Sequence, residues 1–337
     1  MKTYSQVFRQ KHYLSFKIPY RLNWCSAYLD CAEQKVITST INKYLHFSYN
    51  SRKDKKLCVY STETGSFCEV SLQNYRGRTF NWQDYVTGCA AILARNNVSL
   101  KVGANIFIQN DLPSGLGLSS SACFITGIIK ILLELNKIPY ANNMLVSLAY
   151  QVEHDFLGIP CGLMDFKAIL HPYGIWEIDT RHCPLTTDKL LMKESLNIAL
   201  LMPEKTYQHI HLANAKFQEI AKSIYPCEKY AFELHNKDYP PFQYCYMQIQ
   251  NLTKLRVLFE NWKDKKLPYT TCDNILMASN RALNTLLETN RFQDIVGVQM
   301  LGSGIGGAGF KVICPDQHFS FGSYKVVYCK TNSVENL

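Results

Sequence analysis

The sequence predicts a protein of the α+β class with two domains. Alternating segments rich in β-branched residues dominate the first hundred positions, and apolar segments with helical spacing follow them. At 337 residues the chain is long enough for two domains of ordinary size or for one large domain. A change of character near residue 185 divides it into domains 1–185 and 186–337.

The first part of the chain is predicted to contain strands followed by one helix. Two segments with alternating apolar residues, 35–50 and 56–72, are expected to be strands joined by a lysine-rich hairpin. Between Tyr85 and Leu93 apolar residues recur at helical spacing, and a polar run closes this helix. A strand over 98–113 then leads into a glycine-rich stretch.

Two helices and several strands are predicted for the rest of the chain. The apolar segment 122–136 is expected to be a buried helix, and 142–158 a second helix that ends at Gly158. Segment 196–203 is expected to be a strand, and helical stretches follow it up to 275–287. The last segment, 298–316, is expected to be a strand, a glycine-rich loop and another strand.

The net charge of +9 suits a protein that handles anionic substrates such as nucleotides. The basic residues are scattered, and their densest clusters, 51–58 and 261–269, are predicted to be a turn and a loop. Neither cluster is interleaved with exposed aromatic residues in the manner of a nucleic-acid platform. A solvated basic surface is therefore favoured over nucleic-acid binding.

The cysteine pattern predicts a reducing compartment. There are 13 cysteines, an odd number without any C-x-x-C pair, and Cys89, Cys123 and Cys314 lie in apolar segments where cysteine acts as a small hydrophobe. The first 20 residues hold no apolar signal-peptide core, and Lys130 interrupts the longest apolar helix. We expect a cytoplasmic protein without a disulfide framework, a zinc site or a membrane span.

The stretch from Leu112 to Leu135, LPSGLGLSSSACFITGIIKILLEL, places a glycine- and serine-rich loop directly before the buried helix. Glycines let the backbone approach a ligand closely, and the unpaired N–H groups of a helix N-terminus attract phosphate. The alternative is a flexible turn followed by a serine-capped helix. The loop lacks the G-K-[ST] of a Walker A motif and the G-x-G-x-x-G of a dinucleotide fold.

The spacing of this loop resembles the ATP-binding signature of the GHMP kinases, the superfamily of galactokinase, homoserine kinase, mevalonate kinase and phosphomevalonate kinase. Segments 151–181, 301–310 and 18–30 are similar to the catalytic-aspartate segment, the third glycine-rich motif and the first galactokinase motif. The resemblance covers nearly the whole chain. It implies a two-domain fold, with an N-terminal domain like domain 2 of ribosomal protein S5 and a ferredoxin-like C-terminal domain.

The resemblance also implies catalytic roles. Asp165 is expected to be the catalytic aspartate, since phosphoryl transfer needs a carboxylate that orients the acceptor hydroxyl and accepts its proton. Arg21 matches the family's basic residue near that aspartate, where a guanidinium keeps the carboxylate ionised and stabilises charge on the transferred group. Ser121 and Glu153 are expected to hold Mg²⁺ with hard oxygen ligands.

Binding residues follow from the same motifs. The expected ATP-binding residues are Pro113, Gly115, Gly117, Leu118, Ser119, Ser120, Ser121 and, near the adenine, Trp82. The expected substrate-binding residues are Asp30, Asn23, Gly162 and Gly304. The alternative for Trp82 is a core position, because aromatic residues at helical spacing are commonly packed inside.

The acceptor half departs from the galactokinase pattern. Ala27 and Tyr28 stand where galactokinases carry a Glu-His pair, and Gln34 stands near the place of a glycine. Ala308 replaces a cysteine in the third motif, and segment 209–217 lacks the expected tyrosine-containing sugar motif. Sugar hydroxyls that the Glu-His pair would bind cannot be bound by alanine, so the acceptor need not be galactose.

The sequence therefore predicts a kinase that transfers the γ-phosphoryl group of Mg·ATP to a small sugar, with the anomeric hydroxyl as the leading acceptor. The alternatives are a kinase for another polyol (a heptose phosphate, a 6-deoxysugar, a uronic acid or an inositol) and a non-catalytic sensor that binds sugar and ATP. The expected partners are ATP and a small-molecule sugar, without nucleic acid or membrane, in a monomer or homodimer.

Overall fold

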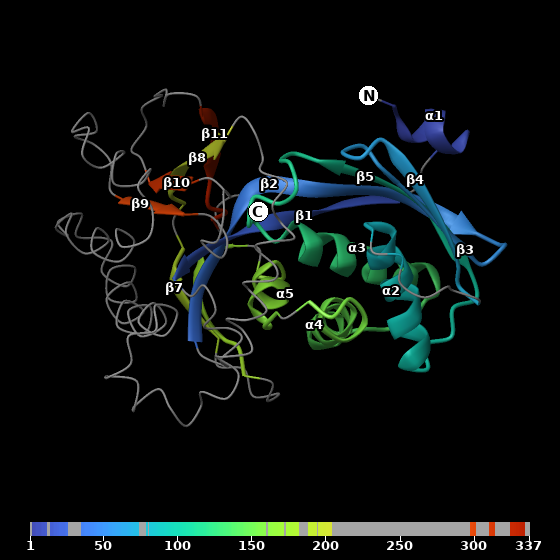
Figure 1. Cartoon of the computed structure of the whole chain (residues 1–337). Coiled ribbons are helices and arrows are strands. Elements are labelled where there is room, and N and C mark those ends of the chain that lie inside the picture. Colours follow the sequence, from blue (N-terminus) through green and yellow to red (C-terminus); the bar gives the residue numbers. More distant parts are fainter. Residues whose placement is uncertain are drawn as a thin grey trace. The chain divides into compact units, whose positions relative to one another are not determined.

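The structure is a computed structural model of the chain. It describes residues 2–11, 14–25, 35–73, 79, 81–159, 161–171, 173–181, 188–193, 195–203, 297–300, 310–313 and 324–333. The chain forms two compact units, drawn in Figure 1. Unit 1 comprises Met1–Tyr20, Lys43–Ser114 and Ser119–Leu170, and unit 2 comprises Arg21–Asn42, Gly115–Leu118 and His171–Leu337. The division into sequential domains at residue 185 stays a prediction.

Unit 1 is built on a mixed sheet. Its strands follow the order β4-β3-β5-β2, with β3 at Lys56–Ser61, β4 at Ser66–Ser71, β5 at Gly103–Asn110 and β2 at Lys35–Arg52, of which residues 43–52 belong to this unit. β5 pairs antiparallel with β2 and parallel with β3, and β3 pairs antiparallel with β4. β1, at Leu14–Cys25, also pairs with β2. The strands predicted at 35–50 and 98–113 are confirmed as β2 and β5. The single strand predicted at 56–72 is wrong in its continuity, because the turn at 62–65 divides it into β3 and β4.

The predicted lysine-rich hairpin between the first two strands is wrong in its pairing. The turn at 53–55 joins β2 to β3, but β5 lies between these two strands and pairs with both. Gly103, the first residue of β5, explains how a third strand fits there: a Cβ on it would lie 2.0 Å from the Lys56 carbonyl oxygen. Only glycine permits so close an approach of two backbones.

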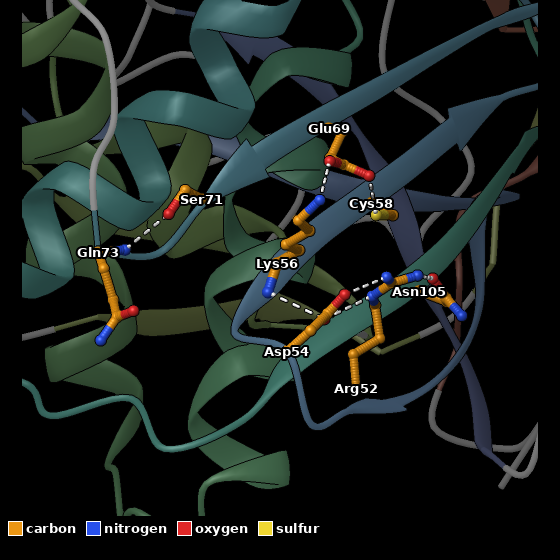
Figure 2. Close-up of polar contacts among 8 residues, drawn as sticks. All are labelled: Arg52, Asp54, Lys56, Cys58, Glu69, Ser71, Gln73 and Asn105. Carbon is orange, nitrogen blue, oxygen red and sulfur yellow. Dashed lines mark hydrogen bonds and ion pairs between the residues drawn. The ribbon is translucent and has the colours of Figure 1, made fainter.

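The basic cluster at 51–58 forms this turn, and acidic groups neutralise several of its charges (Figure 2). The Arg52 guanidinium donates to Asp54 at 2.9 Å and to Asn105 at 2.8 Å, and Lys56 Nζ lies 2.6 Å from Glu69. The hydrogen bond from Arg52 lowers the pKa of Asp54 to about 2. The prediction of a solvated turn is confirmed, with its charges partly paired.

Helices cover both faces of this sheet (Figure 1). Helices α2 (Gln83–Arg95), α3 (Ser120–Leu135) and α4 (Asn142–Gln151) lie on one face, and the short α1 (Tyr4–Phe8) lies on the other. The three helices predicted from periodicity are therefore confirmed. On the outer face Tyr4 packs against Tyr60 and Phe107, while the Tyr4 hydroxyl donates to Asn50 at 2.6 Å.

The contact between α3 and the sheet is unusually close. Gly127, in the middle of α3, faces the buried ring of Phe47 on β2, and a Cβ on this glycine would lie 2.1 Å from the ring. Phe47 in turn stacks on Phe16 with their centroids 5.0 Å apart. Gly127 thus lets α3 pack directly on the sheet.

Two thiols of β3 and β4 are expected to be unreactive in the folded protein. Burial raises the pKa of Cys58 and of Cys68 to about 12, so at pH 8 only about one such thiol in ten thousand is ionised. Iodoacetamide at pH 8 should therefore label both residues only after unfolding, as mapped by mass spectrometry, with the half-buried Cys161 as comparison. Rapid labelling of Cys68 without unfolding would contradict the described packing.

Unit 2 contains the other strand pairs. Residues 35–39 of β2 pair antiparallel with β6 (Ile175–Asp179), which pairs with β7 (Lys189–Met192). A second sheet has the order β11-β8-β10-β9, with all its neighbours antiparallel. Its strands are β8 (Asn197–Pro203), β9 (Gly297–Met300), β10 (Phe310–Ile313) and β11 (Tyr324–Lys330).

These strands confirm two sequence predictions. The strand predicted at 196–203 is β8, and the predicted strand–loop–strand unit has its two strands in β9 and β10, while its glycine-rich loop lies outside the described residues. The helical stretches up to 275–287 also lie outside them. Among the helices that the structure describes, none is long and apolar enough to cross a membrane.

Candidate active site

The glycine-rich loop joins β5 to α3 and alternates buried and open positions. Leu116 and Leu118 are buried, with 2% and 3% of their surfaces exposed, whereas Gly115 is exposed and Gly117 half-buried. Gly115 and Gly117 have φ angles of 81° and 72°, in the left-handed region that only glycine adopts without strain. The leucines thus anchor the loop, and the two glycines keep its backbone open for a ligand.

Arg21 holds the end of this loop within unit 2. The residue lies on β1 and only 5% of its surface is exposed. Its backbone N–H donates to the Leu118 carbonyl oxygen at 3.2 Å, and its Nη1 donates to the Gly117 carbonyl oxygen at 3.3 Å. Arg21 is therefore a structural anchor of the loop, while the role predicted for it beside Asp165 stays a prediction.

The start of α3 contradicts the serine-cap alternative. Ser119 precedes the helix with a φ of 64°, and its side chain makes no capping hydrogen bond. Its Oγ is buried and has no hydrogen-bond partner within the part of the chain that the structure describes. A buried hydroxyl without a partner is costly, whereas a polar ligand at this helix N-terminus would satisfy it.

Glu153 lies in an irregular turn that follows α4. Regular helix α4 ends at Gln151, and Val152–Phe156 form one turn of π-helix in which the Leu157 N–H donates to Val152 at 2.9 Å. The predicted helix over 142–158 is thus confirmed in place but wrong in its regularity. Insertions of this kind are frequent at functional sites. Glu153 is buried, with 7% of its surface exposed.

The surroundings of Glu153 include Tyr85 of α2. Burial raises the pKa of Tyr85, and the negative charge of Glu153 raises it further, so the phenol stays protonated. Helix α2 approaches the π-helical turn closely because Gly88 has no side chain: a Cβ there would lie 2.8 Å from Phe156 and 2.9 Å from Val152. The helix packing therefore positions the buried carboxylate.

Asp165 occupies the first turn of α5 (Met164–Ala168). It is half-buried, between the buried Met164 and Phe166, and its carbonyl oxygen accepts from the Ile169 N–H at 3.3 Å. The buried Gly162 lies just before this helix. A carboxylate in the first turn is favoured by the helix dipole, and its partial exposure leaves it accessible to a substrate.

Trp82, the predicted adenine residue, belongs to an aromatic cluster with Phe124, the fifth residue of α3. Trp82 and Tyr85 both contact Phe124 edge-on, each with 6.3 Å between ring centroids. Trp82 and Tyr85 are half-buried, not fully enclosed. The cluster is therefore neither a plain core position nor an open platform, and the adenine role of Trp82 stays a prediction.

Other predicted residues are distributed as follows. Asn23 is half-buried on β1 in unit 2. Asp30 and Gly304 lie outside the described residues, as do the divergent positions Ala27, Tyr28, Gln34, Ala308 and 209–217. Sequence reasoning missed Glu63, whose carboxylate contacts Ser114 at the start of the loop. No sequence signal links positions 51 residues apart in this way.

A family comparison places these features in a known class. Residues 84–172 match the family model "GHMP kinases N terminal domain". The matched segment carries the glycine-rich loop, Glu153 and Asp165, so the similarity to this family covers these candidate site residues.

Individual relatives extend the match to most of the chain. Galactokinase from Ligilactobacillus salivarius (strain UCC118) is 25% identical over 360 residues, which cover 94% of this chain and 90% of that protein. The crystal structure of Lactococcus lactis galactokinase complexed with galactose is 20% identical, with a TM-score of 0.73, and covers 92% of this chain and 88% of its own. The Methanococcus jannaschii mevalonate kinase structure is 17% identical, with a TM-score of 0.58, and covers 96% and 99%.

Residues 84–172 thus match a GHMP kinase domain, and the chain is similar to galactokinases over most of its length, in agreement with the resemblance of its motifs. The expected α+β GHMP kinase fold is confirmed. The same matches support the expected enzyme class, a phosphotransferase with an alcohol group as acceptor.

Proposed function

We propose that this protein is an ATP-dependent sugar kinase, which transfers the γ-phosphoryl group of Mg·ATP to a sugar hydroxyl, the anomeric hydroxyl in the first place. The observation that carries the proposal is the start of α3, where the buried Ser119 hydroxyl lacks a partner among the described residues and the preceding loop is open at its glycines. The full-length similarity to a galactokinase supports the sugar as acceptor.

The loop is suited to the phosphates of ATP for physical reasons. The first N–H groups of a helix have no partner within it, and the aligned peptide dipoles add a partial positive charge at this end. Ser119, Ser120 and Ser121 stand at this end of α3, and Gly115 and Gly117 keep the loop backbone accessible. Pro113 and Leu118 complete the proposed ATP-binding set, with Trp82 beside the adenine.

The residues proposed to hold Mg²⁺ are Ser121 and Glu153. Hydroxyl and carboxylate oxygens are the ligands that this ion prefers, and a magnesium site that shares its ion with substrate phosphates needs only one or two protein ligands. Bound Mg²⁺ would neutralise charge on the phosphates.

Asp165 is the proposed base. As the γ-phosphoryl group moves, its carboxylate orients the acceptor hydroxyl and takes up the proton. Arg21, which holds the loop through Gly117, is proposed to stabilise charge on the transferred group. Most of the rate enhancement in this reaction comes from positioning and from electrostatic stabilisation, for which a buried guanidinium anchored to the loop is suited.

The acceptor side is proposed to consist of Asp30, Asn23, Gly162 and Gly304. Ala27 and Tyr28 replace the Glu-His pair of galactokinases, which favours an acceptor with another hydroxyl pattern. The alternatives are therefore other polyols, namely a heptose phosphate, a 6-deoxysugar, a uronic acid or an inositol, and a sensor that binds sugar and ATP without turnover. A cytoplasmic monomer or homodimer without nucleic-acid or membrane partners belongs to the proposal.

Ser121→Ala is expected to weaken the use of Mg·ATP. Removing the proposed hydroxyl ligand should raise the Mg²⁺ concentration needed for half-maximal turnover about tenfold, because the remaining carboxylate binds the ion alone. Titration of activity with Mg²⁺ at fixed ATP measures this shift. Ser147→Ala, on the exposed face of α4, is the matched control and should not move it. An unchanged magnesium curve for Ser121→Ala would remove this residue from the metal site.

The direct test of the function is ADP release from Mg·ATP against a panel of free sugars and sugar phosphates. We expect one acceptor class to raise ADP release far above the rate without acceptor. Tight binding of ATP and of a sugar without turnover with any acceptor would replace the kinase by the sensor. Turnover with a heptose phosphate or an inositol alone would keep the kinase and correct its substrate.

A further inference from the structure

We propose that Glu63 is a positioning residue of the glycine-rich loop, and that it sets ATP affinity by fixing Ser114. The inference rests on the proposed function, since it assumes that this loop binds ATP. Glu63 lies in the turn between β3 and β4, far in the sequence from the loop. Glu63 belongs to none of the GHMP kinase motifs found in the sequence.

Both oxygens of the Glu63 carboxylate accept hydrogen bonds from Ser114, at the start of the loop. Glu63 Oε1 accepts from the Ser114 backbone N–H at 2.6 Å, and Oε2 accepts from the Ser114 hydroxyl at 2.6 Å. Oε2 also accepts from Asn110 Nδ2 at 2.7 Å, at the last residue of β5. Hydrogen bonds to an ionised acceptor are roughly twice as strong as neutral ones, and three of them on one side chain fix the direction in which the chain leaves β5.

The turn that carries Glu63 is itself fixed to the same strand. The Thr62 N–H donates to the Ile108 carbonyl oxygen of β5 at 3.0 Å. The carboxylate is therefore fixed beside the end of β5. There it binds Ser114, the residue directly before Gly115, which has a left-handed backbone conformation. A loop with two flexible glycines needs such an external restraint, because glycine loses more conformational freedom on ordering than any other residue.

Neighbouring contacts restrain Asp111 and Leu112, the two residues that follow β5. Asp111 Oδ2 accepts from the Tyr44 N–H at 2.9 Å, and its Oδ1 lies 2.9 Å from His46 Nε2. The Tyr20 hydroxyl donates to the Leu112 carbonyl oxygen at 3.5 Å. These contacts end at Leu112. Nearer to Gly115, Ser114 is held by the two hydrogen bonds to Glu63 and by a longer one from Asn110 Nδ2 to its hydroxyl at 3.4 Å.

The sign of the expected effect separates positioning from charge. A carboxylate near a phosphate site repels an anionic nucleotide, so its neutralisation should strengthen ATP binding if Glu63 acts only through its charge. Loss of its hydrogen bonds to Ser114 should weaken binding, because the loop must then be ordered by ATP itself. A weaker affinity after neutralisation therefore points to positioning.

The test compares Glu63→Ala and Glu63→Gln, which remove the same charge but leave different hydrogen bonds. Glu63→Ala should raise the KM for ATP and the calorimetric Kd for Mg·ATP without acceptor about three- to tenfold, and Glu63→Gln by less. Turnover at saturating ATP and the KM for the acceptor should stay within about twofold. The control is Glu69→Ala, an exposed carboxylate on the next strand that pairs with Lys56 and should leave every constant unchanged.

Each outcome decides the proposal. If the wild-type protein binds Mg·ATP and Glu63→Ala binds it equally or more tightly, the positioning role is wrong. The proposed kinase function is then unaffected. Wild-type protein that does not bind Mg·ATP overturns the proposed function and this inference with it. If Glu63→Ala unfolds, Ser114→Ala replaces it: this exposed substitution removes one of the two bonds to Ser114 and should give a smaller shift of the same sign.

Discussion

Asp165→Asn is expected to reduce turnover by about 10²- to 10⁴-fold, the range in which a general base contributes. The amide has the shape of the carboxylate but cannot accept the proton of the acceptor hydroxyl. Because Asp165 is half-buried in the first turn of a short helix, the isosteric change should leave the fold intact. Affinity for Mg·ATP, measured by calorimetry, should remain within about twofold because the proposed phosphate contacts lie elsewhere.

The matched control is Asp54→Asn, the same change in the turn between β2 and β3, where the carboxylate pairs with Arg52. It should leave kcat unchanged. If Asp165→Asn keeps wild-type turnover with the best acceptor, then Asp165 is not the base. If it loses ATP affinity and turnover together, the residue supports the structure of the site and the chemistry must be assigned to another group.

Gly127→Ala is expected to destabilise the protein by about 2 kcal/mol or more. In an exposed helix the same change stabilises by about 1 kcal/mol, because alanine has the better helix propensity. Here the added Cβ would lie 2.1 Å from the Phe47 ring, whose own position is fixed by burial and by stacking on Phe16. Overpacking costs about 1–3 kcal/mol and occasionally more. At an approach of 2.1 Å the cost is expected at or above the upper end of this range, so about 2 kcal/mol or more remains after the propensity gain is subtracted. Urea denaturation measures the free energy of unfolding.

Phe47→Leu tests whether contact with the Phe47 ring causes the destabilisation by Gly127→Ala. This change removes the ring atoms that the new methyl group would meet, so the double variant Gly127→Ala/Phe47→Leu should be more stable than the sum of the two single changes predicts. Additive effects would show that the methyl group meets something else. A stabilised Gly127→Ala would contradict the close packing of α3 on the sheet.

Local sequence patterns predicted the elements well where local forces decide. Helices α2 and α3 follow apolar periodicity, and β5 lies within the segment predicted as the strand before the glycine-rich loop. The insertion of β5 between β2 and β3 was not predicted, because strand order depends on contacts far apart in the sequence. Its trace in the sequence is Gly103, which is informative only once the Lys56 backbone is known to face it.

The candidate site shows the same division. Glycine and serine composition predicted the loop, and the motif spacing predicted its class. The π-helical turn that carries Glu153 was expected as regular helix, since a one-residue insertion leaves no strong mark on periodicity. The hydrogen bonds between Glu63 and Ser114 could not be predicted from the sequence, because a carboxylate in a polar turn is expected to be solvated. Ala27 and Tyr28 depart from the galactokinase pattern beside the matching Asp30, so the sugar is identified by the acceptor panel and not by similarity.

Phosphorus NMR of the reaction with Mg·ATP and the acceptor selected by the ADP-release panel tests the central claim most directly. We expect the γ-phosphate signal of ATP to disappear as one phosphomonoester signal grows, coupled to the anomeric proton of the sugar, and we expect neither change with Asp165→Asn. A γ-phosphate signal that persists with the wild-type protein, or that is converted only to inorganic phosphate, would contradict the transfer to a sugar hydroxyl.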